Sequence, residues 1–120
     1  MHEFSIAEAL IDLIKQHLPA GSTLLAVTIE SGPMRGIDRE AMQFAWQSIT
    51  PGTCCENARL DLRILPWKMQ CPACGKQFES PDMYVDCSCG HTSPYPQGGD
   101  DLRLLSLEVD SPDEAVSRSL

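Results

Sequence analysis

Two closely spaced pairs of cysteines constrain the fold of this chain more than any other feature of its sequence. Cys71 and Cys74 lie in the sequence CPACG, and Cys87 and Cys89 lie in the sequence CSCG. Each pair places two thiols on a tight turn, where the following glycine relieves the backbone. Four thiolates favour a tetrahedral zinc ion, and a closed shell of sulfur leaves no position for substrate water. The two pairs therefore predict a structural metal site.

The segment around these pairs, residues 67–97, is rich in Cys, Pro and Gly and shows no helical or strand periodicity. A loop-rich segment of this size cannot bury an apolar core of its own. Zinc sites of this type bind with apparent free energies of about 10–16 kcal/mol, which is sufficient to fold a small unit. We therefore expect residues 67–97 to form an inserted, loop-rich, zinc-ribbon-like domain.

The second cysteine pair departs from the usual C-x-x-C spacing, since only Ser88 separates Cys87 from Cys89. Two ligand sets remain open on the residues alone. Either Cys89 completes the site through a tighter loop, or the imidazole of His91 replaces it. Cys89 is favoured because a thiolate is the softer ligand.

The sequence on both sides of the cysteine segment follows the periods of helices and strands. Ser5 and Glu8 fit a capping box that predicts a helix starting at Ser5, and Asp38 is expected to cap a second helix. The apolar faces of these helices are Ile6, Leu10, Ile14 and Leu18 in the first, and Met42, Ala45, Trp46 and Ile49 in the second. Alternating apolar residues predict strands over 24–30, 58–64 and 102–109, the last with Leu105, Leu107 and Val109 on one face.

These elements predict an α/β (α+β) fold with a small sheet of about three or more strands and two helices. We expect residues 1–66 and 98–110 to form this main domain and residues 67–97 to be inserted between two of its strands. Residues 111–120 lack a large apolar cluster and are expected to be a flexible tail.

Charge and hydropathy exclude two classes of partner. Seventeen acidic against nine basic residues give a formal charge of -8, the wrong sign for a surface that binds nucleic acid. Within residues 67–97, Lys68 and Lys76 are outnumbered by Glu79, Asp82 and Asp86. No apolar run approaches the roughly 20 residues needed to span a membrane. The N-terminus has no export signal, so we expect a cytoplasmic protein whose six cysteines are metal ligands or free thiols.

The first three residues offer a second kind of metal site. The α-amine of Met1, the imidazole of His2 and the amide nitrogens between them can form fused chelate rings around one ion. Nitrogen donors in a plane suit Ni(II) or Cu(II), and Glu3 can add an oxygen. The thiolates of the cysteine pairs would instead be preferred by zinc.

The remaining candidate residues are expected to have ordinary structural roles. Adjacent cysteines do not easily reach one ion, so Cys54 and Cys55 are expected to pack as small apolar residues. His17 is placed to interact with the last carbonyls of the first helix, and no nucleophile has a neighbouring partner, which argues against an enzyme. The residues interpreted as solvated surface charge are Arg35, Arg39 and Glu40.

Taken together, these features resemble the HypA family of nickel-incorporation proteins for nickel–iron hydrogenase maturation. The resemblance is carried by Met-His-Glu at the N-terminus, SIAEAL in the first helix, Gly52-Thr53, the two cysteine pairs and DDLRLLSLE at residues 100–108. It spans nearly the whole chain up to about Val109.

This resemblance implies a metallochaperone with a nickel-binding α/β domain and an inserted zinc domain. It implies transient Ni(II) at His2, supported by the Met1 amine and Glu3, and structural Zn(II) bound by Cys71, Cys74, Cys87 and Cys89. The implied partners are a nickel-handling GTPase, the hydrogenase large subunit and, in some organisms, urease maturation proteins. The alternative from another class is a rubredoxin-like electron carrier with iron bound by the four cysteines. Purified protein of that kind would be red rather than colourless.

Overall fold

The computed structural model describes residues 2–110, and Met1 and the predicted tail at 111–120 lie outside the described residues. Its elements are α1 (His2–His17), β1 (Thr23–Ser31), the 3₁₀ turn η1 (Pro33–Arg35), α2 (Arg39–Ile49), β2 (Arg59–Ile64), β3 (Trp67–Gln70), β4 (Gln77–Ser80), β5 (Tyr95–Pro96) and β6 (Leu102–Asp110). Within this part of the chain, neither helix combines the length and the apolar character needed to cross a membrane.

The described residues divide into two compact units. Residues 2–29, 37–62 and 104–110 belong to the first unit, and residues 30–36 and 63–103 belong to the second. The segment predicted to carry the metal site, residues 67–97, lies wholly within the second unit.

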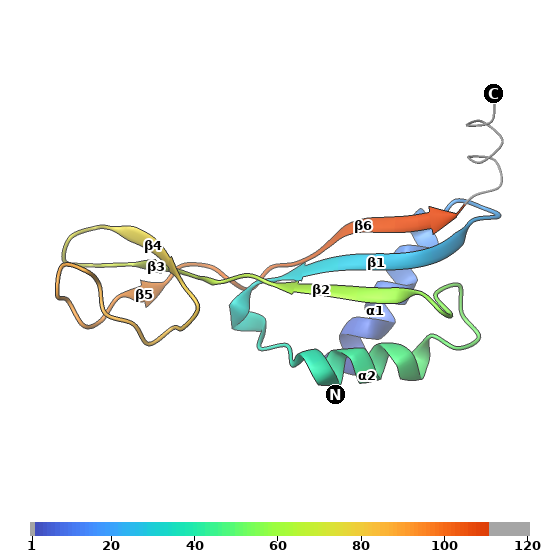
Figure 1. Ribbon diagram of the computed structural model, residues 1–120, viewed down its shortest axis with the longest axis horizontal. Coiled ribbons are helices and arrows are strands. Elements are labelled where there is room, and N and C mark those ends of the chain that lie inside the picture. The colour runs from blue at the N-terminus through green and yellow to red at the C-terminus, as the bar shows by residue number, and fades with distance from the viewer. Residues whose placement is uncertain (1, 111–120) are drawn as a thin grey trace, which may run out of the picture. The chain divides into compact units, whose positions relative to one another are not determined.

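The larger sheet has the strand order β2-β1-β6. The strands β1 and β2 run in the same direction and are connected through α2, whereas β6 runs the opposite way (Figure 1). The predicted α/β class with two helices and a small sheet is confirmed.

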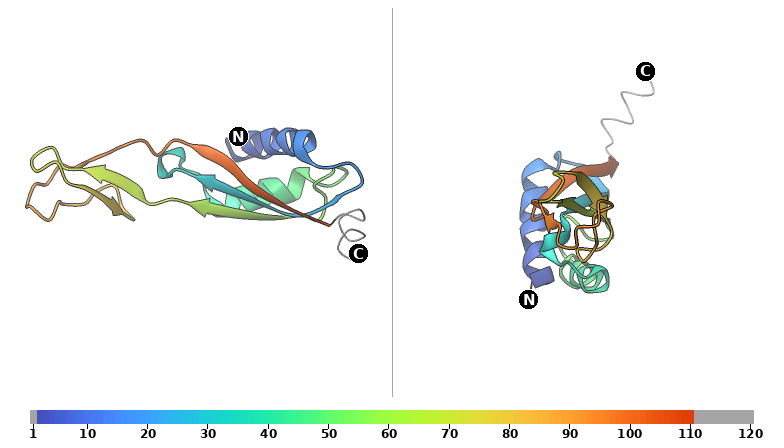
Figure 2. Two further views of the ribbon diagram at one scale, coloured as in Figure 1. Left: turned by 90° about the horizontal axis from the view of Figure 1, so that it is seen from above. Right: turned by 90° about the vertical axis from the view of Figure 1, so that its left-hand side faces the viewer.

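The core of the first unit is formed by the apolar stripes of the two helices and by the strands they cover. The face of α1 contributes Ile6, Ala7, Leu10, Ile11 and Ile14, all buried, so the helical period is confirmed. In both views of Figure 2, α1 lies along one side of the strands. The predicted face of α2 also holds, since Met42, Ala45 and Trp46 are buried and Ile49 is half-buried.

The first helix begins earlier than its sequence predicts. It starts at His2, so Ser5 lies inside the helix and the predicted capping box is wrong. A carboxylate oxygen of Glu3, in the first turn, accepts a hydrogen bond from the backbone N–H of Asp38 at 3.2 Å. This contact fixes the first turn of α1 to the start of α2, which a local sequence pattern does not reveal.

The second helix is capped as predicted, because the Asp38 side chain accepts from the N–H of Ala41 at 2.9 Å. Three side chains at successive turns of this helix also donate to backbone carbonyls in β2 or at the residue just before it. They are Arg39 Nη1 to the carbonyl of Leu62 at 2.7 Å, Gln43 Nε2 to Leu60 at 2.8 Å, and Trp46 Nε1 to Ala58 at 2.8 Å. We call these three donors the carbonyl ladder. Arg39 is exposed, in line with its interpretation as surface charge, and it also serves as a structural donor.

Strand β6 follows its predicted bounds closely but differs in its buried face. Leu107 and Val109 are half-buried, as expected, whereas Leu105 is 41% exposed. The alternation shifts at Leu105 and Ser106, which are consecutive exposed residues, and Leu102 and Leu104 are the half-buried side chains before the shift. An edge strand tolerates such a shift because it has one neighbour instead of two.

The second unit contains a small sheet of its own, with strand order β4-β3-β5. Trp67 pairs with Ser80 and Gln70 with Gln77 in the antiparallel β3–β4 register, while β5 is only two residues long. The segment is therefore less irregular than its sequence indicates, because strands of two to four residues are too short to show a period. Arg35, interpreted as solvated charge, donates through Nε to the carbonyl of Asp100 at 2.8 Å.

Candidate metal centres

The four cysteines of the second unit converge on one point. Their sulfur atoms all lie within 4.8 Å of one another. Two contacts join the pairs, with Cys71 Sγ 3.6 Å from Cys89 Sγ and Cys74 Sγ 3.7 Å from Cys87 Sγ. We call these four residues the sulfur cluster.

The first pair is held by the turn that connects β3 and β4. The N–H of Cys71 donates to the carbonyl of Lys76 at 3.0 Å, and the N–H of Gly75 donates to the carbonyl of Cys71 at 2.9 Å. Gly75 has a φ of 77°, a conformation that residues with a side chain rarely adopt. The turn thus places both sulfurs on the same side of the loop.

The second pair is held in a similar way despite its shorter spacing. The N–H of Cys87 donates to the carbonyl of His91, and the N–H of Gly90 donates to the carbonyl of Cys87, each at 2.9 Å. Gly90 has a φ of 97°. The turn brings Cys89 into the sulfur cluster, while the group of four ligand atoms found among the described residues does not include the His91 imidazole. His91 contributes its backbone instead.

A link between the two loops was not predicted from the sequence. Lys76 Nζ donates to Ser88 Oγ at 3.1 Å, which joins a residue two positions after the first pair to the residue inside the second. Only the position of both residues close to cysteines could have drawn attention to them. The contact is exposed, so it positions the loops more than it stabilises them.

Backbone donors and neighbouring thiols give the cluster an uneven distribution of charge. Burial acts to raise the pKa of Cys71, but N–H groups of Cys74 and Ala73 that donate to its sulfur outweigh this and lower the pKa to about 6. The N–H of His91 acts to lower the pKa of Cys89, but the thiols of Cys87 and Cys71 prevail and raise it to about 11. The cluster thus favours a thiolate at Cys71 and a protonated thiol at Cys89.

The spacing of the sulfur atoms fits a tetrahedral metal ion. With a metal–sulfur distance of about 2.3 Å, as for zinc, the edges of a regular S₄ tetrahedron are about 3.8 Å long. The separations of 3.6 and 3.7 Å are close to that value. The donor set is the one that selects zinc or iron among biological metals.

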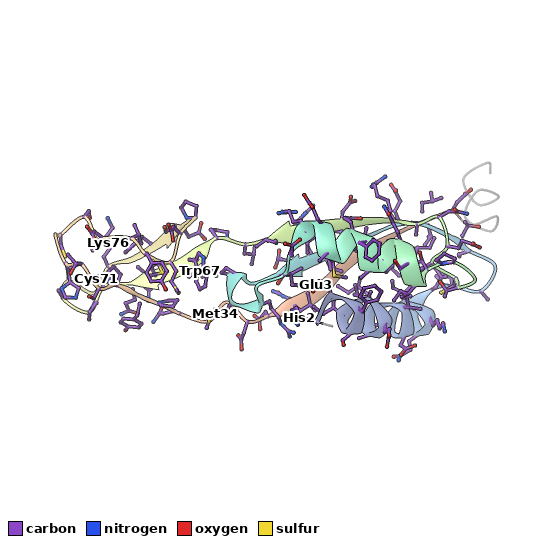
Figure 3. The ribbon with its side chains drawn as sticks, turned by 90° about the horizontal axis from the view of Figure 1, so that it is seen from below. His2, Glu3, Met34, Trp67, Cys71 and Lys76 are labelled. Carbon is purple, nitrogen blue, oxygen red and sulfur yellow. The ribbon has the colours of Figure 1, made fainter. Side chains whose placement is uncertain are left out.

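The residues of the other predicted site lie at the start of the first unit. His2 is exposed at the beginning of α1, and Glu3 is half-buried and bonded to Asp38 (Figure 3). Met1, which was predicted to supply the amine, lies outside the described residues. The predicted metal residues thus fall on two units, with His2 and Glu3 in the first and the sulfur cluster in the second.

The adjacent cysteines of the first unit differ from each other. Cys55 is buried with 0% exposure, as its predicted packing requires, whereas Cys54 is exposed. Their sulfur atoms nevertheless lie 3.8 Å apart. Packing as a small apolar residue therefore holds for Cys55 and is wrong for Cys54.

Comparisons with known proteins agree with this arrangement. Residues 1–109 match the family model described as "Hydrogenase/urease nickel incorporation, metallochaperone, hypA". The chain is 32% identical over 111 residues to a hydrogenase maturation factor HypA of Geobacter metallireducens, covering 92% of this chain and all of the relative. It is 33% identical over 113 residues to that of Azotobacter vinelandii, with the same coverage.

Solved structures give the same result. The solution structure of the nickel metallochaperone HypA from Helicobacter pylori matches with a TM-score of 0.61 and 25% identity, over 92% of this chain and 99% of that one. A second HypA solution structure matches with a TM-score of 0.63 and 26% identity, over 92% of this chain and 98% of the other. The chain therefore belongs to the HypA family of hydrogenase/urease nickel-incorporation metallochaperones, which are non-catalytic maturation factors.

Proposed function

We propose that this HypA protein carries Ni(II) at its N-terminus, through the Met1 amine, the His2 imidazole and the amide nitrogens that follow, with Glu3 in support. The observation that carries this proposal is the start of α1 at His2. The first N–H groups of a helix have no intrahelical acceptor, so the amides at this end are free to lose their protons to a metal. The His2 side chain is exposed and can turn toward the same ion.

Nickel loading requires a local rearrangement of the N-terminal turn, and the reversal of this rearrangement favours release. A planar chelate of consecutive nitrogens does not fit helical backbone angles, so the first turn of α1 must unwind around the ion. The Glu3–Asp38 hydrogen bond at 3.2 Å opposes this unwinding. When a receiving site competes for the nickel, the first turn of α1 can return to its helical form, and this return favours the transfer.

We further propose that the sulfur cluster binds zinc through Cys71, Cys74, Cys87 and Cys89 and that residues 67–97 act as a structural zinc domain. Two sulfur separations across the cluster, 3.6 and 3.7 Å, are close to the edge of a zinc–thiolate tetrahedron and support this assignment. The family assignment favours zinc in a metallochaperone over iron in a rubredoxin-like carrier, because the family model covers residues 1–109. Protein that is colourless and contains one equivalent of zinc is the expected result, and a red iron protein would contradict it.

The partners that we propose follow from the maturation role. They are a nickel-handling GTPase, the hydrogenase large subunit and, where the organism has one, the urease maturation system. The cytoplasm is the expected compartment, since free thiols persist where the medium is reducing.

Nickel titration by calorimetry tests the N-terminal site. Wild type, a His2→Ala variant and a chain extended by one residue at its N-terminus should be compared, all loaded with zinc. We expect each change to lower nickel affinity by more than about tenfold, because loss of an outer-shell partner alone has effects of about 10–100-fold. Equal affinities in the three proteins would remove the N-terminus from the site. The extended chain keeps every side chain, so a loss of nickel affinity in it is due to the change at the Met1 amine.

A further inference from the structure

Cys54 and Cys55 form a thiol pair that neither nickel carriage nor the zinc site uses. Side chains of adjacent residues point to opposite sides of an extended chain, yet these two sulfurs lie 3.8 Å apart. The cause is the turn between α2 and β2. Thr53 Oγ1 accepts from the N–H of Cys55 at 3.1 Å and donates to the carbonyl of Thr50 at 2.6 Å.

The loop continues in the same tight path, which holds the pair in place. The N–H of Glu56 donates to the carbonyl of Thr53 at 3.1 Å, and the N–H of Ala58 donates to the carbonyl of Cys55 at 3.0 Å. Ala58 also accepts the indole N–H of Trp46 in the carbonyl ladder. The position of Cys55 is therefore tied to the core of the first unit.

The two thiols differ in their access to solvent, which determines the order in which they can react. Cys54 is exposed and can be reached by a reagent in solution, whereas Cys55 is fully buried and has Cys54 as its sulfur neighbour. Burial raises the pKa of Cys55 to about 12, and the positive charge of Lys15 opposes that shift. Attack from solvent therefore begins at Cys54, and Cys55 can only respond to what forms there.

We propose that Cys54 and Cys55 are a reversible two-electron oxidation site that closes to a vicinal disulfide in the presence of a hydroperoxide. The Cys54 thiolate attacks the terminal peroxide oxygen, the O–O bond breaks, and Cys54 becomes a sulfenic acid as water or an alcohol leaves. The Cys55 sulfur then attacks the Cys54 sulfur, the S–O bond breaks, and the thiol proton leaves with the hydroxyl group as water. Two thiols have lost two electrons and two protons to the peroxide.

The geometry also indicates that this disulfide is easily reduced. Consecutive Cα atoms across a trans peptide lie about 3.8 Å apart, below the range of about 4.4–6.8 Å that unstrained disulfides prefer. Strained disulfides have the more oxidising potentials and belong to the labile class. The oxidised form is thus expected to form with peroxide and to revert with a mild dithiol, which is the behaviour of a switch and not of a structural staple.

Peptide mapping after peroxide treatment of zinc-loaded protein tests the proposal. Trypsin cleaves after Arg39 and Arg59, so peptide 40–59 contains Cys54 and Cys55 and no other cysteine. The sulfur cluster falls on peptides 69–76 and 77–103. We expect peptide 40–59 to lose two hydrogens at a peroxide dose that releases no zinc, and dithiothreitol to restore them.

Two single variants separate the steps. In Cys55→Ser the sulfenic acid at Cys54 has no partner, so dimedone should label peptide 40–59 several-fold more than in wild type. In Cys54→Ser, which changes an exposed side chain, peptide 40–59 should keep its one thiol. The proposal is overturned if dimedone labels wild type as strongly as Cys55→Ser, or if the cluster loses zinc before peptide 40–59 changes mass.

Discussion

The two units of this protein are stabilised by different means. In the first, helices and strands bury a continuous set of apolar side chains that includes Ile14, Ile29, Met42 and Trp46. Within residues 30–36 and 63–103, by contrast, the buried apolar side chains are Met69 and two cysteines of the sulfur cluster. One unit is folded by burial, while the other needs an ion to complete it.

The largest expected effect comes from breaking the sulfur cluster. Removal of zinc by a chelator, or a Cys74→Ser substitution, should unfold the second unit, because such sites contribute about 10–16 kcal/mol of apparent binding free energy. The first unit should stay folded. Amide hydrogen exchange checks this through rapid exchange in β3 and β4 and slow exchange in β1. The exposed cysteine of the first unit provides a control, Cys54→Ser, which should keep both units protected.

A cavity in the other core should give the reverse result. Ile14 has 0% exposure, so Ile14→Ala should lower the free energy of unfolding of the first unit by about 2–5 kcal/mol. Its sequence neighbour Leu13 is 36% exposed, and Leu13→Ala should change stability by about 0.5 kcal/mol or less. Urea unfolding followed by circular dichroism measures both. Zinc content should be the same in the two variants, and loss of zinc in Ile14→Ala would show that the units are not independent.

The carbonyl ladder allows a finer test within the first unit. Gln43→Met keeps the length of the side chain but removes the donor to Leu60, so we expect a loss of about 0.5–1.5 kcal/mol. Gln47 is exposed on the same helix, and Gln47→Met is the matched control with nearly equal helix propensity. Equal free energies of unfolding in the two variants would mean that the hydrogen bond from Gln43 to Leu60 does not stabilise the first unit.

Thiol ionisation gives the clearest chemical contrast, and its effect is confined to alkaline pH. Burial raises the pKa of Cys55 from 9.0 to about 12, so the folded first unit prefers the protonated thiol. This contribution to stability is fully present below pH 9 and is lost as pH rises toward about 12. Wild type should therefore lose more stability than Cys55→Ala over that range in parallel thermal melts. If the two proteins have the same pH dependence, the environment of Cys55 does not favour the thiol.

The fold was predictable where one helix face or one strand face meets the core. The stripe from Ile6 to Ile14 and the alternation around Leu60 repeat at the periods of helix and strand, and both are buried as expected. The start of α1 was not predictable. The first turn is bonded through Glu3 to Asp38, which is far away in sequence and meets it only when the helices are packed.

The site was predictable to the extent that its chemistry is local. Each cysteine pair lies on one turn, so spacing alone brings two sulfurs together, and Gly75 and Gly90 are visible markers of those turns. Spacing did not decide between Cys89 and His91, because that depends on where the Cys87 turn points. The approach of the Cys54 and Cys55 sulfurs was missed for the same reason.

The carbonyl ladder has a consequence for how copies of this protein can associate. The backbone carbonyls of Ala58, Leu60 and Leu62, along one border of the larger sheet, already accept hydrogen bonds from side chains of α2. Lateral growth of that sheet is left with the border of β6. The carbonyls that an added strand would need on the β2 side are already bonded, which disfavours the addition of a strand there.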